Sequence, residues 1–189
     1  ADRLRGRIET ILDYAKACEY REGDNPAAWK GMLEPILGKV KHEVRAQPSL
    51  PYQEIGVFMD KLRQRNGSAA QALEFVILTA ARSGEVLGAT WSEIDFTKKI
   101  WVIPKERMKA GKEHRIPLSE TALKLLATIP RMVSSDYIFQ APRGGTLSDM
   151  ALTTLIRRMH TTAVDAGGQG FIDPKQNRVA TPHGFRSTF

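Results

Sequence analysis

The residues with the clearest chemical potential stand in the stretch T-P-H-G-F-R-S-T-F at positions 181–189. This stretch places His183 and Arg186 three residues apart, and Pro182 suits the first turn of a helix. Residues i and i+3 share one face of a helix, so an imidazole and a guanidinium would point the same way. Backbone N–H groups at a helix N-terminus also favour anions. The stretch therefore predicts a phosphate-binding arrangement.

Three further residues are candidates for the same chemistry. Arg82 follows a nearly all-apolar segment, Glu85 comes three residues later, and Lys109 lies in a basic run around a glycine. Each has a plainer interpretation: Arg82 could cap helix carbonyls, Glu85 could form a surface ion pair or hold Arg82 in place, and Lys109 could be simply solvated. His114 and His160 are interpreted as structural residues.

Several other kinds of site are excluded by the absence of their motifs. The sequence contains no Walker loop, no G-x-G-x-x-G, no G-x-S-x-G and no Cys/His cluster with metal-ligand spacing. Its single cysteine, Cys18, excludes a disulfide framework and fits a reducing compartment. No apolar run approaches 18 residues, so the sequence predicts no membrane span.

The charge of the chain is unevenly placed. There are 28 Lys and Arg against 21 Asp and Glu, a net charge of +7. Residues 101–189 hold 13 basic and 7 acidic residues, so most of the excess lies there. A basic surplus predicts a nucleic acid or another polyanion as partner, although a solvated basic surface is the plainer alternative.

The first elements predict the end of a helical domain. Apolar residues recur at helical spacing over 2–20, and Asn25-Pro26 is typical of a helix start before a short helix over 27–37. Two such helices seldom form an independent core, so residues 1–38 are predicted to be the C-terminal part of a helical domain. Residues 39–51 are polar, basic and proline-bounded, which favours a linker over a surface loop.

A second domain is predicted over 52–189. We expect helices over 52–65, 69–81, 119–129 and 148–166, with Ser68, Ser119 and Ser148 as caps. Strands are expected over 93–96, 100–103 and 115–118, and a basic hairpin tip over 104–114. A Gly-rich polar loop is expected over 167–179. The fold class is therefore mainly α with a small antiparallel three-stranded sheet.

Taken together, three motifs resemble the catalytic domain of tyrosine recombinases, and most closely prophage integrases of the P4-like group. These motifs are A-A-R-S-G-E-V-L-G-A-T-W-S-E-I-D, M-K-A-G-K-E-H-R-I-P-L-S and T-P-H-G-F-R-S-T-F. The resemblance covers about residues 48–189, and the Asn25-Pro26 segment extends it to the family's helical core-binding domain. It implies site-specific recombination of double-stranded DNA at attachment sites, through a 3′-phosphotyrosyl intermediate, in the bacterial cytoplasm near the nucleoid.

The resemblance also implies roles for individual residues. Arg82 and Arg186 would clamp the scissile phosphate, Lys109 would protonate the leaving 5′-oxygen, and His183 would transfer protons and bind the phosphate. Glu85 would orient the clamp from behind. Arg107 and Lys112 would contact the DNA backbone. No metal or other cofactor is expected, because the arginines supply the positive charge.

The chain departs from the family pattern in one respect. The family's nucleophilic tyrosine follows H-x-x-R, whereas every tyrosine here precedes it: Tyr14, Tyr20, Tyr52 and Tyr137. We therefore expect a catalytic domain incomplete at its C-terminus, inactive alone and possibly monomeric, from a protein that forms tetramers on DNA. We also expect the shortened turn around Arg186 to be poorly ordered. Two alternatives remain: a non-catalytic DNA-binding module with the recombinase fold, and an enzyme acting on small anionic substrates.

Overall fold

The computed structural model describes residues 2–38, 46–108, 110–132 and 135–188. The chain divides into two compact units, Ala1–Arg45 and Ala46–Phe189. Residues 46–51, expected to be part of a linker, thus lie within the second unit. Among the described helices, none combines the length and apolar character needed to cross a membrane.

The first unit consists of α1 (Asp2–Ala17), an irregular turn η1 (Trp29–Leu33) and the short helix α2 (Glu34–Leu37). The continuous helix expected over 27–37 is therefore wrong. Lys30 has ψ 130° and Gly31 has φ 77°, so the backbone leaves the helical region twice within one turn. The positive φ of Gly31 is a conformation that glycine adopts readily, which explains why the helix breaks there.

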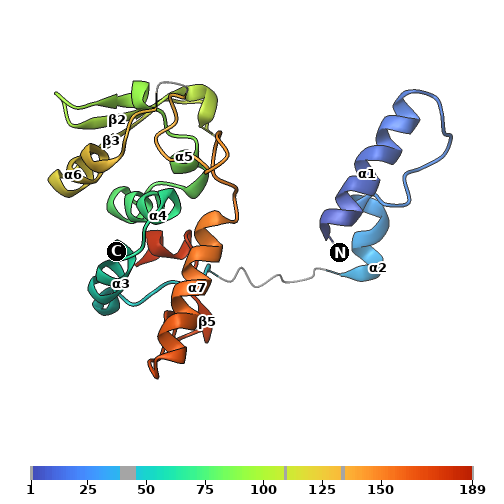
Figure 1. Ribbon diagram of the computed structural model, residues 1–189. Helices are drawn as coiled ribbons and strands as arrows, with labels where there is room; N and C mark the ends of the chain where they lie inside the picture. Colours follow the sequence, from blue (N-terminus) through green and yellow to red (C-terminus); the bar gives the residue numbers. More distant parts are fainter. Residues whose placement is uncertain (1, 39–45, 109, 133–134, 189) are drawn as a thin grey trace. The chain divides into compact units, whose positions relative to one another are not determined.

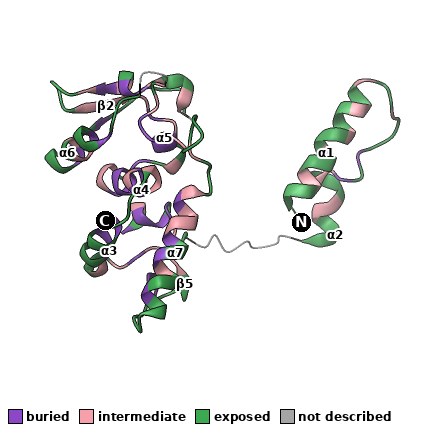
Figure 2. Ribbon diagram, viewed as in Figure 1, coloured by how far each residue is buried: buried purple, intermediate pink, exposed green. Residues whose placement is uncertain are grey.

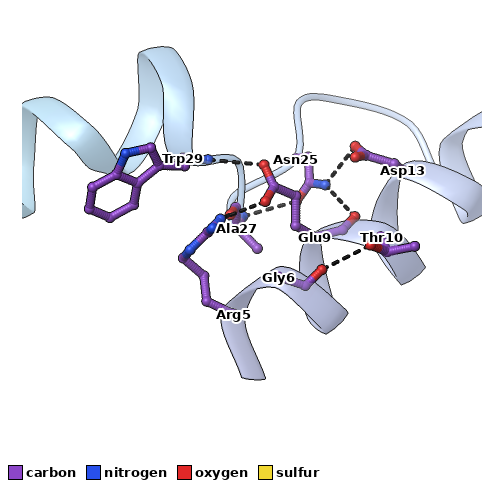
Figure 3. Close-up of polar contacts among 8 residues, drawn as sticks. All are labelled: Arg5, Gly6, Glu9, Thr10, Asp13, Asn25, Ala27 and Trp29. Carbon is purple, nitrogen blue, oxygen red and sulfur yellow. Dashed lines mark hydrogen bonds and ion pairs between the residues drawn. The ribbon is translucent and has the colours of Figure 1, made fainter. Parts of the chain in front are cut away.

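Hydrogen bonds of the Asn25 side chain hold the turn before η1 against α1 (Figure 3). Its Nδ2 donates to the Glu9 carbonyl at 2.9 Å and to Asp13 Oδ1 at 2.7 Å, while its Oδ1 accepts from the Ala27 amide at 2.9 Å. Asn25 is thus a turn residue that bridges to a distant helix. The helix start expected at Asn25-Pro26 is wrong, because η1 begins after Ala28. Glu9 adds a bond from the Trp29 amide to its Oε1 at 3.1 Å.

The second unit is built around α4 (Ser68–Thr79), which lies among its other helices in Figure 1. This helix contacts α3 (Ile55–Arg63), α5 (Ser83–Leu87), α6 (Glu120–Thr128) and α7 (Ala151–Asp165). Leu73, Phe75 and Val76 are almost completely buried, and the helix is mostly purple in Figure 2. An apolar sequence on most sides of a helix requires such a central position.

The three-stranded sheet forms as expected. Strands β1 (Ile94–Asp95), β2 (Ile100–Ile103) and β3 (His114–Pro117) pair antiparallel in the order β1-β2-β3. In β2, Trp101 and Ile103 are buried and alternate with less buried neighbours. This alternation arises because successive side chains point to opposite faces of a strand.

The remaining elements agree with the expectations less closely. Ser119 caps α6 by accepting the Ala122 amide at 3.2 Å, as predicted. By contrast, α7 begins at Ala151 after Met150 rather than directly after Ser148. The polar loop expected over 167–179 contains a short antiparallel pair, β4 (Ile172–Asp173) and β5 (Arg178–Val179).

Candidate active site

Arg82 stands where α4 gives way to α5. Helix α4 ends at Thr79, and the left-handed backbone of its C-cap Ala80 (φ 50°) turns the chain. Arg82 is extended at φ −72°, ψ 144° as the N-cap of α5. Its backbone N–H donates to Glu85 Oε2 at 3.0 Å, and its Nη1 donates to Glu85 Oε1 at 2.6 Å. The guanidinium therefore pairs with Glu85, and its side chain remains 52% exposed.

Glu85 is a buried carboxylate held in its charged form. The residue is only 8% exposed. Burial opposes ionisation, but hydrogen bonds from the Arg82 backbone and guanidinium, with the charges of Arg82 and Arg186, hold the pKa of the Glu85 carboxyl below its usual value. The electrostatic effect of Arg186 on Glu85 also indicates that the stretch T-P-H-G-F-R-S-T-F lies near the motif that contains Glu85.

Arg186 lies on η5 (Gly184–Ser187), a short 3-10 turn, with His183 as its N-cap residue. The Arg186 amide donates to the His183 carbonyl at 3.2 Å. Phe185 between them is 1% exposed, and its ring packs on Phe58 with a centroid distance of 4.8 Å. Our expectation that this turn would be poorly ordered is therefore wrong, because the buried phenylalanine anchors it.

The guanidinium of Arg186 has a hydrogen-bond donor that the described residues do not use. Its Nη1 is buried and has no hydrogen-bond partner among the described residues. A buried donor without a partner is costly, and such groups in native structures call for an explanation. An anion bound by the Arg186 guanidinium would supply the missing acceptor. His183 is exposed on the same turn.

The basic hairpin can be placed only in part. Lys109 lies outside the described residues. Lys112 is exposed, as a DNA-backbone contact requires. Arg107 is engaged internally: its Nη1 donates to Glu93 Oε1 and its Nη2 to the Glu85 carbonyl, and its side chain is 25% exposed. The predicted DNA contact of Arg107 is therefore less favoured than that of Lys112.

Glu93 was missed as a structural partner of the site. Its side chain, 9% exposed, accepts the Trp101 indole N–H at 2.9 Å and the Thr90 amide at 3.4 Å, in addition to Arg107. The signal was present in the sequence, because T-W-S-E has the Thr-x-x-Glu spacing of a capping box. Glu93 and Arg107 thus join the sheet to the backbone of α5.

The geometry described above agrees with the comparison with known proteins. The model of the phage integrase family matches residues 49–189, about three quarters of the chain. The chain belongs to the phage integrase family. A second model, the phage integrase central domain, matches residues 1–32. The boundary between the two matches falls near the division between the compact units.

Relatives of this integrase-family chain are known from phages and bacteria. It is 29% identical to the integrase of Enterobacteria phage P4, over 90% of this chain and 42% of the relative. It is 32% identical to the prophage integrase IntA of Escherichia coli K12, over 72% of this chain and 32% of the relative. The chain thus spans less than half the length of these relatives.

Solved structures show the same fold. The Tn1549 transposon integrase in complex with a circular intermediate DNA superposes with a TM-score of 0.69 at 13% identity, covering 98% of this chain and 63% of that one. A lambda integrase tetramer bound to a Holliday junction gives 0.61 at 22% identity, covering 97% and 51%. The resemblance to tyrosine recombinases is therefore confirmed at the level of family and fold.

Proposed function

We propose that this chain is the phosphate-binding part of a site-specific DNA recombinase, a prophage integrase that cuts and rejoins double-stranded DNA. One observation carries the proposal: Arg82 donates to the buried Glu85 carboxylate, Arg186 helps to lower the pKa of that same carboxyl, and Arg186 retains a buried donor without a partner among the described residues. Two guanidinium groups near one carboxylate suit a phosphodiester.

The proposed chemistry is an in-line transfer at phosphorus. A tyrosine hydroxyl attacks the scissile phosphate and the bond to the 5′-oxygen breaks, which leaves a 3′-phosphotyrosyl link. Arg82 and Arg186 stabilise the charge that develops on the non-bridging oxygens. His183 receives the proton of the attacking hydroxyl, and Lys109 donates a proton to the departing 5′-oxygen. Religation reverses these steps.

We expect the nucleophile to be a tyrosine that follows Arg186 in a longer form of the protein. Tyr52 is 64% exposed at the start of the second unit, and Tyr137 is half-buried where its backbone pairs with Thr90. Both precede Arg186, whereas the family's nucleophile follows the corresponding arginine. We therefore propose that the 189-residue chain binds DNA without cleaving it, and that a longer form carrying a downstream tyrosine performs the reaction as a tetramer.

A duplex that carries an attachment site, with a nick beside the cleavage position, tests both parts of the proposal. These are DNA binding without cleavage by the 189-residue chain and cleavage by the longer form. Cleavage at such a nick releases a short fragment, so a covalent complex accumulates. The 189-residue chain should bind this DNA with an affinity that falls steeply with salt, because phosphate contacts release counterions. It should form no covalent adduct. The longer form should form one that survives denaturation.

The outcomes separate the alternatives. A covalent adduct with the 189-residue chain would contradict the predicted absence of a nucleophile. Salt-sensitive binding by both forms, with no adduct from either, would favour a non-catalytic DNA-binding module. If the chain binds inorganic phosphate but not duplex DNA, an enzyme that acts on small anionic substrates becomes the better interpretation. Arg82→Lys serves as the matched variant, since it keeps the charge and loses the bidentate geometry.

A further inference from the structure

Residues 46–50, hereafter the strap, lead into the second unit and lie against the turn that carries Arg186. We propose that the strap positions this turn, so that phosphate binding by Arg186 depends on the first residues of the second unit. The link to phosphate rests on the proposed function, whereas the positioning itself rests on the contacts described below. The groups responsible are the Pro48 carbonyl and Thr181.

The strap binds both ends of η5. The Pro48 carbonyl accepts the Thr181 amide at 3.0 Å and the Thr181 hydroxyl at 3.3 Å. The Thr181 hydroxyl oxygen in turn accepts the Gly184 amide at 3.0 Å, at the first residue of the turn. At the other end, the Thr188 hydroxyl donates to the Leu50 carbonyl at 2.9 Å. Arg186 thus lies between two attachment points to one short segment.

The strap is itself fixed from its other side. The Ser49 amide donates to Asp173 Oδ2 at 3.1 Å, and Gln176 Nε2 donates to the Ala46 carbonyl at 3.0 Å. Asp173 is 5% exposed and also accepts the Lys175 amide at 2.8 Å, which holds its carboxylate in place. These contacts involve residues more than 120 positions apart in the sequence. The strap is therefore part of the second unit, and its backbone is held in place on the side of Asp173 and Gln176.

The glycine in H-G-F-R, Gly184, lies where the backbone of the strap approaches the turn closely. A Cβ added to Gly184 would lie 1.8 Å from the Pro48 carbonyl oxygen and 3.0 Å from the Ser49 Cα. Both atoms belong to the backbone, so no side-chain rotation can relieve the overlap. Close backbone approach, rather than a special φ, explains the glycine at this position.

Displacing Pro48 therefore displaces Arg186. Phe185, the residue between Gly184 and Arg186, packs on Phe58, which gives the turn one fixed side. The strap provides the other. If the strap moves away, the amide and hydroxyl of Thr181 lose the Pro48 carbonyl as acceptor, and the Thr188 hydroxyl loses the Leu50 carbonyl. The turn then keeps its aromatic anchor but loses its orientation. The expected result is a folded protein with one phosphate contact fewer.

Paired insertions in the 189-residue chain test this inference. A Gly-Ser pair between Arg45 and Ala46 leaves every strap contact possible. The same pair between Pro48 and Ser49 moves these two residues apart. The Pro48 carbonyl and the Ser49 amide can then no longer both keep their partners, Thr181 and Asp173. Duplex DNA affinity is measured from low to physiological salt, and amide hydrogen exchange is followed at Thr181 and Gly184. Urea midpoints show whether each variant is folded.

The insertion before Ala46 should leave DNA affinity and exchange unchanged. The insertion after Pro48 should speed exchange at Thr181 and Gly184, weaken DNA binding by about tenfold and reduce the slope of log K against log salt by about 1, which corresponds to one lost phosphate contact. Thr181→Val should act in the same direction, because it removes the hydroxyl. Thr181→Ser should restore the wild-type behaviour.

A salt slope equal to wild type in a folded Thr181→Val protein and in the folded Pro48/Ser49 insertion variant would overturn the inference. If the wild-type chain binds no DNA, the proposed function fails, and hydrogen exchange still decides whether the strap holds the turn. In that case, unchanged exchange at Gly184 in both variants contradicts the positioning role. If the insertion after Pro48 unfolds the chain, the comparison of Thr181→Val with Thr181→Ser provides the decision.

Discussion

At the residue scale, Glu85 balances the charge of the candidate site. It is almost completely buried, it accepts two bonds from Arg82, and it lies in the field of Arg186. Without this carboxylate, Arg82 would lose its paired charge and Arg186 a nearby counter-charge. Glu85 therefore offsets the positive charge of the two arginines that we propose bind phosphate.

Glu85→Gln should destabilise the second unit by about 1–3 kcal/mol, because a charged acceptor of two hydrogen bonds is lost. Urea denaturation measures this. Glu113→Gln is the matched control, since the Glu113–Arg115 pair is exposed (47% and 70%) and its loss should cost less than about 0.5 kcal/mol. Equal effects of the two substitutions would show that burial of Glu85 does not matter.

The pH dependence of the Glu85→Gln effect has a definite sign. The pKa of Glu85 is lowered in the folded protein, so the carboxylate stabilises the fold above its unfolded pKa. This contribution is lost as the pH falls through the folded pKa. The difference in unfolding free energy between the wild type and the variant should therefore shrink in acid. A difference that grows on acidification would contradict the assignment.

Arg107 and Lys112 should separate under mutation, although both are cations of the same hairpin. Arg107→Ala removes the partner of a nearly buried carboxylate and should cost about 3 kcal/mol or more. Lys112→Ala should leave stability unchanged and reduce the salt slope of DNA binding by about 1, if Lys112 contacts a phosphate. Thermal unfolding and DNA titration measure the two effects. Equal stability of both variants would count against the internal role of Arg107.

At the element scale, the helix starts follow local rules only where the surrounding backbone permits. Ser119 takes the cap position of α6, and its hydroxyl accepts the Ala122 amide. Ser148 precedes an equally periodic segment, yet the Ala151 amide bonds to the Ser148 carbonyl and the helix begins later. The same residue type therefore has two different roles.

Ser119→Ala should reduce stability by about 1 kcal/mol, because the Ala122 amide loses its acceptor. Ser148→Ala should change stability by less than about 0.5 kcal/mol, since the bond at that position uses the backbone. Chemical denaturation of the two variants side by side provides the comparison. A larger loss from Ser148→Ala would indicate that its side chain caps α7 after all.

At the scale of the whole molecule, the two units differ in how much they bury. Helix α1 has no buried residue, and Leu4 and Ile11 on it are 64% and 65% exposed. Helix α4 has seven buried residues. Local stability follows buried apolar contacts, so the first unit should open far more often than the second.

Amide hydrogen exchange of the 189-residue chain should therefore show protection in α1 that is at least about 100-fold lower than in the centre of α4. Asn25 donates two of the described long-range hydrogen bonds of the first unit, so Asn25→Ala should lower the protection of α1 further. Protection in α4 should not change. Equal protection of the two helices would contradict the expected difference in stability.

The sequence by itself determined the features that depend on neighbouring residues. The apolar segment around Phe75 specified a central helix, the short apolar segment around Trp101 specified a strand, and the spacing of His183 and Arg186 placed both on one turn. Short-range hydrogen bonding and side-chain periodicity produce these features, and both can be read along the chain. The combination of three motifs also identified the family.

Only the tertiary structure decided which distant groups meet. It brought Arg186 into the field of Glu85, turned Arg107 inward to Glu93, and laid the Pro48 carbonyl against Gly184. Such partners depend on how several elements pack around α4, and a backbone carbonyl has no signature in the sequence. For this reason the chemistry of the site could be anticipated from residue types, whereas the way it is held in place could not.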